Sequence, residues 1–380
     1  MEKKGCGIIC EYNPFHLGHK YQLEMAKNVC DYTVCVMSGD FVQRGEAAFQ
    51  QKSVRAKNAC NNGADIVLEL PFPYSSFGAE GFAYKGVEIL TKSGLCSHIM
   101  FGSECGDANV LKDIATLLCK DGFYDRVVGE QKKEKSLSFA KARQLIVEKE
   151  LGKEYAEVLD NPNDILGVEY IKAIIRQGSN LEPVPIKRTT PRGGFDETFA
   201  SSSYIRKNLS DKENGDFAKS RLPENYDFSG IYNGVDRFYE TMLINLAMKN
   251  ESDYENILEV PKDFGSTIAQ YAMKSENYDE LCQNLCGKTI TQSKVKRMLL
   301  FCFFGVEKER YCDKAEYTQV LALSELGAKM LKKYRDESDI VIASRIKDIK
   351  NNDKAYEQYS FSRLAGEIFE KCCRNCQTEK

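Results

Sequence analysis

Two histidines near the start of the chain, His16 and His19, are the residues whose types and spacing best suit chemistry. The sequence has three histidines in all, and Gly18 lies between these two. An apolar, strand-like run and an Asn-Pro turn signal come before them, and helical propensity resumes from about Leu17. The spacing of three therefore predicts that both imidazoles lie on one side of the first turn of a helix.

The start of a helix favours an anion, because its free N–H groups and the positive end of its dipole face the ligand. A glycine such as Gly18 lets the backbone approach that ligand closely. Two imidazoles beside an anion site indicate triphosphate chemistry. The alternative is that His16 and His19 are ordinary turn residues. The motif follows a strand in an α/β pattern, where ligands gather at the carboxyl ends of strands, and this favours the functional interpretation.

Strand and helix patterns alternate through about the first 206 residues. Beyond the first strand, we expect strands at residues 32–37, 64–70, 97–104 and 181–187, with helices at 53–61 and 81–92 between them. A mainly helical, charged segment at 109–152 interrupts the series. Strands separated by helices pair in parallel through right-handed crossovers. The sequence therefore predicts an α/β fold with a Rossmann-like parallel sheet.

The pattern changes after about residue 207. Amphipathic helices are expected at 235–248, 267–273 and 293–304, and short strand-like runs lie at 317–323 and 339–344. We therefore expect two domains. Residues 1–206 would form a nucleotide-binding catalytic domain, and residues 207–380 a mainly helical C-terminal domain.

The composition is that of an ordinary soluble protein, with 42% hydrophobic and 29% charged residues among 380. The formal net charge of −3 provides no global field that attracts nucleic acid, so any RNA binding needs a local basic patch. We see no signal peptide and no apolar run long enough to span a bilayer. We expect a cytoplasmic protein without membrane association, and no protein partner is evident.

Fifteen cysteines are scattered through the chain, many in apolar segments where cysteine behaves as a small hydrophobe. A reducing compartment is the simplest interpretation. Cys372, Cys373 and Cys376 could form half of a metal site. No second pair with matching spacing completes a tetrahedral set, so we expect no protein-bound metal.

Six stretches together resemble one known family. They are Cys-Glu-Tyr-Asn-Pro-Phe-His-Leu-Gly-His (10–19), Met-Ser-Gly-Asp-Phe-Val-Gln-Arg-Gly-Glu (37–46), Gly-Ala-Asp-Ile-Val-Leu-Glu-Leu-Pro (63–71), Phe-Gly-Ser-Glu (101–104), Pro-Asn-Asp-Ile-Leu-Gly (162–167) and Ser-Ser-Ser-Tyr-Ile-Arg (201–206). In this order they resemble the bacterial tRNA(Met) cytidine acetate ligase family, which is part of the HxGH nucleotidyltransferase superfamily. The resemblance is strong over the first 206 residues and looser beyond them.

The resemblance implies a reaction in two steps. ATP, with Mg²⁺, and acetate form acetyl-adenylate and pyrophosphate. N4 of the wobble cytidine of elongator tRNA(Met) then attacks the acyl carbon and becomes N4-acetylcytidine. The enzyme's work in such a scheme is to position the reactants and to neutralise charge on the phosphates. The helical C-terminal domain would bind the tRNA.

The resemblance also implies roles for individual residues. His16, His19 and Arg206 would be catalytic. The nucleotide would be held by Gly7, Ile8, Glu11, Tyr12, Asn13, Pro14, Phe15, His16, Gly18, His19, Lys20, Gly102, Asn163, Arg188, Ser202 and Ser203. Further candidate cations are Arg44, Lys52 and Arg55. Lys294, Lys296 and Arg297, at the start of an expected helix, would contact tRNA phosphates, although a solvent-facing helix end explains them equally well.

Two other functions remain open at this point. A small-molecule adenylyltransferase of the pantetheine-phosphate or nicotinate-nucleotide type would use the same HxGH chemistry, but such enzymes are generally shorter. An RNA-binding protein without catalysis would not need the set formed by His16, Gly18, His19 and Arg206.

Overall fold

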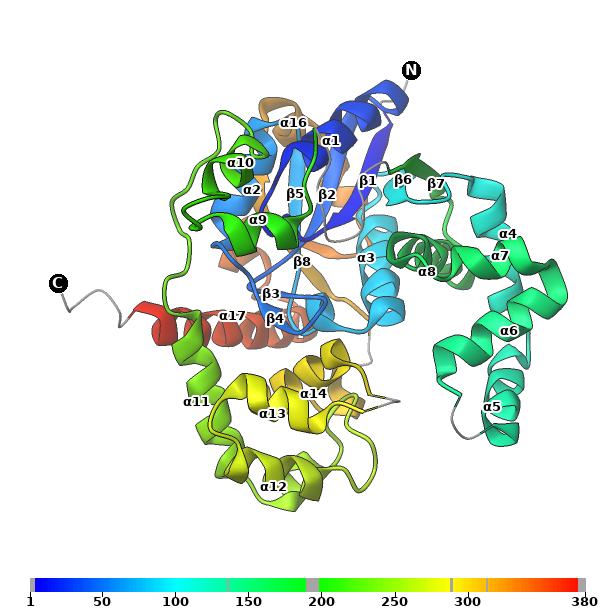
Figure 1. The fold of residues 1–380 in the computed structure, drawn as a ribbon. Coiled ribbons are helices and arrows are strands. Elements are labelled where there is room, and N and C mark those ends of the chain that lie inside the picture. Colours follow the sequence, from blue (N-terminus) through cyan, green and yellow to red (C-terminus); the bar gives the residue numbers. More distant parts are fainter. Residues whose placement is uncertain (1–3, 135–136, 189–197, 288–289, 312–313, 375–380) are drawn as a thin grey trace.

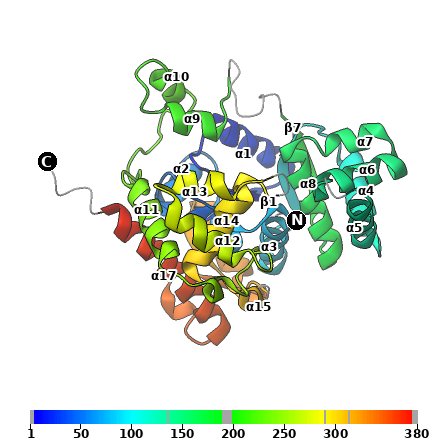
Figure 2. The same ribbon diagram turned by 60° about the horizontal axis from the view of Figure 1, so that its bottom comes forward.

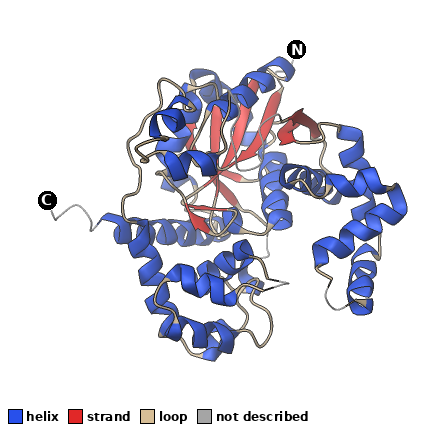
Figure 3. Cartoon of the chain, viewed as in Figure 1, coloured by secondary structure: helices blue, strands red, loops and turns tan. Residues whose placement is uncertain are grey.

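A seven-stranded, mainly parallel sheet forms the centre of the molecule (Figures 1 and 3). The computed structural model describes residues 4–134, 137–188, 198–287, 290–311 and 314–374. Along the sheet the order is β7-β6-β1-β2-β5-β8-β9, and neighbours pair in parallel except β5 with β8. The strands are β1 (Gly5–Cys10), β2 (Tyr32–Ser38), β5 (Ile66–Leu70), β6 (His98–Ser103), β7 (Glu182–Lys187), β8 (Tyr317–Leu323) and β9 (Val341–Ala343), beside a separate hairpin of β3 (Phe41–Val42) and β4 (Glu46–Ala47). The predicted α/β fold is confirmed.

Helices cover both faces of the sheet, which explains the near-continuous apolar runs in its central strands. Successive side chains of a strand point to opposite faces. Ile8 therefore packs with α1 (Leu17–Val29) and α2 (Lys52–Asn61). Its neighbour Ile9 packs on the other face with α3 (Ala79–Ser93), where a side chain at Gly86 would meet Ile9.

A helical lobe is inserted in the connection between β6 and β7, on the right in Figure 1. It consists of α4 (Ala108–Leu118), α5 (Phe123–Lys133), α6 (Phe139–Leu151) and α7 (Lys153–Val158), followed by α8 (Pro162–Gln177), which packs on α3. The predicted helical segment at 109–152 is confirmed. Because the lobe is inserted after β6, its own length does not disturb the order of the sheet.

The chain after residue 206 is mainly helical, as predicted. The helices α11 to α14 gather below the sheet in Figure 1 and come to the front in Figure 2. The helices of the C-terminal half are α9 (Ser202–Asn208), α10 (Gly215–Ser220), α11 (Val235–Ala247), α12 (Gly265–Lys274), α13 (Tyr278–Leu285), α14 (Gln292–Phe304), α15 (Lys308–Tyr311), α16 (Glu325–Tyr334) and α17 (Asp353–Arg374). Short 3-10 turns lie at Tyr74–Ser76, Glu251–Tyr254, Arg335–Glu337 and Ile346–Asp348. Over the described ranges, no helix has the length and apolar character needed to cross a membrane.

The last part of the chain returns to the sheet. β8 pairs antiparallel with β5, and β9 pairs in parallel with β8. Both strands fall in the strand-like runs that the sequence indicates. The boundary expected at residue 206 therefore does not coincide with an edge of the sheet, because residues beyond it complete the sheet that the first half begins.

A cluster of phenylalanine rings joins the sheet to the C-terminal helices. Phe41, in the β3–β4 hairpin, has its ring centroid 5.1–5.6 Å from those of Phe72, Phe238, Phe304 and Phe369. These rings come from the loop after β5 and from α11, α14 and α17. All but Phe304 are buried. The two halves of the chain thus share one continuous hydrophobic core.

Two glycine-to-alanine substitutions test how tightly the returning segment packs. An added Cβ at Gly327, in α16, would lie 1.9 Å from Asp65 O, at the start of β5. One at Gly129, in α5, would meet no atom within 4 Å. We expect Gly327→Ala to lower the free energy of unfolding by about 2–3 kcal/mol, and Gly129→Ala to raise it by about 1 kcal/mol, because alanine favours a helix. Urea denaturation measures both, and equal effects would contradict the packing described.

Candidate active site

The loop after β1 crosses the carboxyl edge of the sheet and leads directly into α1. β1 and β6 pair at only two positions among their described residues, Cys6 with His98 and Gly7 with Ile99. Beyond these the two strands no longer pair, at the point where the order of the sheet reverses. Such a point is where open α/β sheets bind ligands. α1 begins at Leu17, as predicted, with His16 as its N-cap.

His16 and His19 cap the helix with their own rings. The Gly18 N–H donates to His16 Nδ1 at 3.1 Å, and the His16 N–H donates to His19 Nδ1 at 3.3 Å. The two rings are stacked, with centroids 3.7 Å apart and planes inclined by 20°. A neutral imidazole whose Nδ1 accepts a hydrogen bond carries its proton on Nε2. Each ring therefore keeps an Nε2–H donor, and the predicted placement on one side of the first turn is confirmed.

Burial keeps both rings neutral. It lowers the pKa of His16 to about 3, and the nearby Arg188 guanidinium adds to the effect. Burial also lowers the pKa of His19 well below its ordinary value, with His16 and Arg188 contributing in the same direction. Tyr12 and Phe15, both fully buried, pack against the His19 ring at centroid distances of 4.8 and 5.8 Å. The imidazoles thus act as fixed hydrogen-bond donors.

A pocket opens beside the two rings, with about 580 Å³ of space free of protein atoms, part of it open to solvent. Five residues predicted from the sequence line it: His16, Gly18, His19, Gly102 and Arg188. The Arg188 side chain lies over Gly102, where an added Cβ would be 3.1 Å from Arg188 Cδ. The absence of a side chain at Gly102 therefore lets the guanidinium reach the pocket.

Tyr21, which follows Lys20 on α1, also lines the pocket. The lining residues that the sequence did not predict are Gln22, Ile186, Lys187, Phe199 and Ala200. Gln22 is three residues after His19, on the same helical face, so the periodicity of α1 could have indicated it. The strand-end position of Lys187 is also visible in the sequence. No local signal marks Phe199, which reaches the pocket only through the path of the chain.

Arg206 lies on the other side of the loop after β1. Its Nη1 donates to Asn13 O at 2.5 Å, and its Nη2 lies 4.0 Å from Glu46 Oε2. Ser201 caps α9 by accepting the Tyr204 N–H, and Ser202 Oγ donates to Pro14 O at 3.5 Å. The start of α9 is therefore held against the loop that carries the histidines.

Comparisons with known proteins identify the family. The sequence matches the family described as HIGH Nucleotidyl Transferase over residues 3–380. The tRNA(Met) cytidine acetate ligase of Thermoanaerobacter sp. (strain X514) is 34% identical over 377 residues, which cover 94% of this chain and 93% of that protein. Its namesake from Clostridium botulinum (strain Okra / Type B1) is 35% identical over 361 residues, covering 89% and 88%. The chain belongs to the tRNA(Met) cytidine acetate ligase family.

A solved structure shares the whole fold. The crystal structure of Thermotoga maritima TmcAL bound with alpha-thio ATP superposes with a TM-score of 0.88 at 29% identity, covering 97% of this chain and 95% of that one. As a member of the tRNA(Met) cytidine acetate ligase family, the chain is a ligase with the fold of HIGH nucleotidyltransferases, as the sequence predicts. The roles expected for individual residues stay predictions.

The remaining expected nucleotide residues are not among the described residues that line this pocket. Gly7 and Ile8 lie inside β1 and are buried in the sheet. Glu11 accepts the Gln43 N–H at 3.0 Å, and burial raises the pKa of its carboxyl. Asn163 Nδ2 donates to Glu104 Oε1 at 2.5 Å, beyond the end of β6. Lys20 is half-buried on α1 and Ser203 is exposed on α9.

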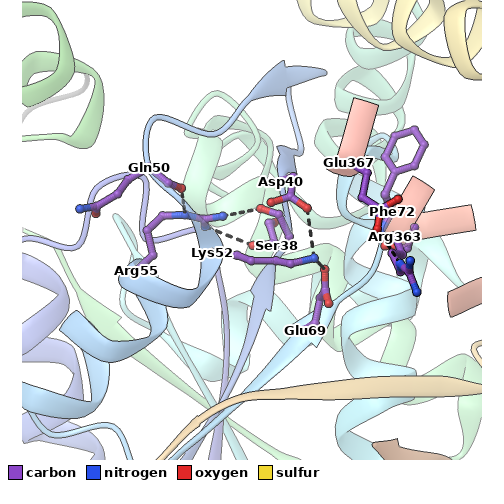
Figure 4. Close-up of polar contacts among 11 residues, drawn as sticks. Ser38, Asp40, Gln50, Lys52, Arg55, Glu69, Phe72, Arg363 and Glu367 are labelled. Atoms are coloured by element: carbon purple, nitrogen blue, oxygen red, sulfur yellow. Dashed lines mark hydrogen bonds and ion pairs between the residues drawn. The ribbon is translucent and has the colours of Figure 1, made fainter. Parts of the chain in front are cut away.

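Two of the further candidate cations make contacts inside the chain (Figure 4). The Arg55 guanidinium is fully buried and donates to the carbonyl oxygens of Gln50, Glu11, Ser38 and Gly39. These hydrogen bonds satisfy carbonyl oxygens that would otherwise have no partner. The expectation that Arg55 binds phosphate is therefore wrong.

Lys52 is used in the same way. Its Nζ lies 3.1 Å from Asp40 Oδ2 and 2.7 Å from Glu69 Oε1. Burial alone would lower the pKa of Lys52, but the two carboxylates raise it above its ordinary value. Its charge fixes the loop after β2 to the end of β5. The expectation that Lys52 is a further cation for the nucleotide stays a prediction. Arg44 is exposed, and its charge acts on the Glu11 carboxyl, so its role as a further cation stays a prediction.

The expected basic patch at the start of α14 is also largely paired inside the chain. Lys296 Nζ lies 2.7 Å from Glu46 Oε1, and Arg297 Nε donates to both oxygens of Glu259 at 2.9 and 3.0 Å. The first contact joins α14 to the β3–β4 hairpin. Among the described residues, Lys294 has no acidic partner of this kind. Two of the three charges that were expected to contact tRNA phosphates are therefore paired within the chain.

The C-terminal cysteines lie away from this site. Cys373 is buried, and Cys372 Sγ is 3.9 Å from Thr241 Oγ1. Cys376 lies outside the described residues. In the part of the chain that the structure describes, no group of three His, Cys, Asp or Glu side chains is placed to hold a metal ion.

The low pKa of His16 predicts a pH-dependent stability. In the unfolded chain His16 binds a proton below about pH 6.5, whereas in the folded chain it does so only near pH 3. The folded state therefore loses stability as the pH falls between these values. From pH 7 to pH 5 this amounts to about 2 kcal/mol for His16. His16→Asn keeps a capping side chain without the titration, so urea denaturation should show a loss smaller by that amount. An equal loss in both proteins would contradict the assignment.

Proposed function

We propose that this protein is an ATP-dependent tRNA(Met) cytidine acetate ligase, which activates acetate as acetyl-adenylate and acetylates N4 of the wobble cytidine of elongator tRNA(Met). The observation that carries the proposal is the stacked pair of neutral imidazoles at the start of α1, with an Nε2–H left on each ring. The names of the relatives support the same reaction, and the solved relative is bound with alpha-thio ATP.

In the first half-reaction a carboxylate oxygen of acetate attacks the α-phosphorus of ATP. The bond from that phosphorus to the oxygen bridging to the β-phosphate breaks, and pyrophosphate leaves with the electron pair. Negative charge grows on the phosphate oxygens during this step. Preorganised donors in a site shielded from water stabilise such charge most effectively. His16 and His19 would donate to the phosphates, and Arg206 would stabilise the departing pyrophosphate.

In the second half-reaction the cytidine N4 attacks the acetyl carbonyl carbon. A C–N bond forms, the C–O bond to AMP breaks, and the nitrogen loses one proton. AMP is a good leaving group, so the protein's main task is to hold the two reactants together. We expect the chain after residue 206 to bind the tRNA, because it contacts the elements around the site: Lys296 Nζ donates to Glu46 of the β3–β4 hairpin, and Arg221 O accepts the N–H of Leu17 at the start of α1. A tRNA-modifying enzyme of this kind would act in the cytoplasm.

Mg²⁺ is expected to accompany ATP. Magnesium commonly binds through substrate phosphates and few protein carboxylates. The donor set of the pocket fits that mode, because the imidazole N–H groups and the Arg188 guanidinium complement phosphate and leave the metal to the nucleotide. When bound, Mg²⁺ neutralises part of the phosphate charge.

One assay separates this proposal from its alternatives. The protein is incubated with ATP, radiolabelled acetate and bulk tRNA, and AMP, pyrophosphate and labelled tRNA are measured. A ligase labels the tRNA and produces AMP. Transfer of the nucleotide to a small acceptor would indicate an adenylyltransferase, and retention of tRNA without turnover would indicate an RNA-binding protein.

The role of the imidazole pair is tested by substitution. We expect His19→Ala to lower kcat by about 100- to 1,000-fold, because one preorganised donor to the phosphates is lost. His98→Ala is the matched control: His98 lies at the opposite end of β6, where its Nε2 pairs with Glu182. The control should retain acetylation. Near-normal turnover by His19→Ala, with folding intact by circular dichroism, would contradict the proposed mechanism.

A further inference from the structure

Gln22 holds a fixed position in the pocket, one turn of α1 beyond His19. Its Nε2 donates to Met100 O at 3.2 Å, across the gap that opens where β1 and β6 cease to pair. A backbone carbonyl can only accept, so this bond determines which end of the amide faces the strand. Among the described residues it is the one hydrogen bond recorded for the Gln22 side chain. The amide oxygen Oε1 and the second N–H of Nε2 remain for a ligand.

The same pocket offers faces on which a flat heterocycle can stack. Tyr21 and Phe199 both line it, with ring centroids 5.8 Å apart. The Arg188 side chain lies across Gly102 on the sheet side. Bases stack on aromatic rings and on guanidinium planes irrespective of their identity. The pocket therefore offers donors for phosphate at the imidazoles and, beside them, flat side chains on which any base can stack. Stacking alone does not distinguish one base from another.

We propose that Gln22 reads the base of the nucleotide and selects adenine. This inference rests on the proposed function, because it concerns the triphosphate that the site activates. A glutamine amide matches adenine by accepting from the N6 amine and donating to the neighbouring ring nitrogen. Guanine and hypoxanthine present an oxygen at position 6, so two acceptors would face each other. A buried acceptor without a donor disfavours those bases.

The first test compares nucleotides with the wild-type protein by calorimetry. ATP, purine riboside triphosphate and inosine triphosphate differ at position 6, where they carry a donor, a hydrogen and an acceptor, and inosine also carries a proton on N1. We expect affinity to fall in that order, with inosine triphosphate bound about 10- to 100-fold more weakly than ATP. Equal affinity for ATP and inosine triphosphate would overturn the inference. This test needs no variant and no tRNA.

The second test compares Gln22→Met with the wild type. Methionine keeps the length of the side chain and lacks both hydrogen-bonding groups. We expect the preference for ATP over inosine triphosphate to shrink to about 2-fold or less, with most of the change in the affinity for ATP. If Gln22 only joined α1 to β6, the substitution would lower the affinity for both nucleotides equally and leave the preference for ATP unchanged. That result would overturn the inference.

Two control variants on the same helix sharpen the comparison. Tyr21→Leu should weaken both nucleotides by the same factor, because stacking does not distinguish bases. Glu24→Gln, at an exposed position, should change neither affinity. The outcomes also separate this inference from the proposed function. A wild-type protein that prefers ATP but acetylates no tRNA refutes only the function, whereas one that acetylates tRNA and binds both nucleotides equally refutes only the role of Gln22.

Discussion

The hydrogen bond from the His16 N–H to His19 Nδ1 is the interaction on which the site depends. Together with the bond from Gly18 to His16, it stacks the two rings and leaves both protons on Nε2. This arrangement requires neutral rings, because a protonated Nδ1 could not accept. The buried floor made by Tyr12 and Phe15 supplies that condition by keeping water from the rings. The cap of α1, the burial of the two rings and the direction of their Nε2–H donors therefore depend on one another.

Buried polar contacts hold the loop after β2 in place. Arg55 binds four of the surrounding carbonyl oxygens, and Lys52 bridges Asp40 to Glu69. These contacts fix the base of the β3–β4 hairpin. At its tip Glu46 lies between Arg206 and Lys296. One short hairpin thus connects Arg206, which holds the loop after β1, with the helices of the C-terminal half.

Much of the fold can be predicted from local sequence patterns. The features that cannot be predicted depend on contacts between residues far apart in the chain. Alternating apolar runs and helices indicate the parallel strands, and the spacing of His16 and His19 indicates their shared turn. The pairing of β8 with β5 joins residues some 250 positions apart, as Ile66 with Leu323 shows, and no local pattern encodes such a partner. The same limit applies to charges. Arg55 and Lys296 look like phosphate ligands in sequence, because their carbonyl and carboxylate partners become neighbours only in the folded chain.

The position of β8 has a consequence for synthesis on the ribosome. Every residue that lines the pocket is made by residue 200, but the outer edge of β5 is covered only when residues 317–323 emerge. Until then the nascent chain carries an open row of backbone donors and acceptors, which invites pairing with other chains. A protein that terminates early would hold every described residue of the pocket lining on an unfinished, association-prone scaffold.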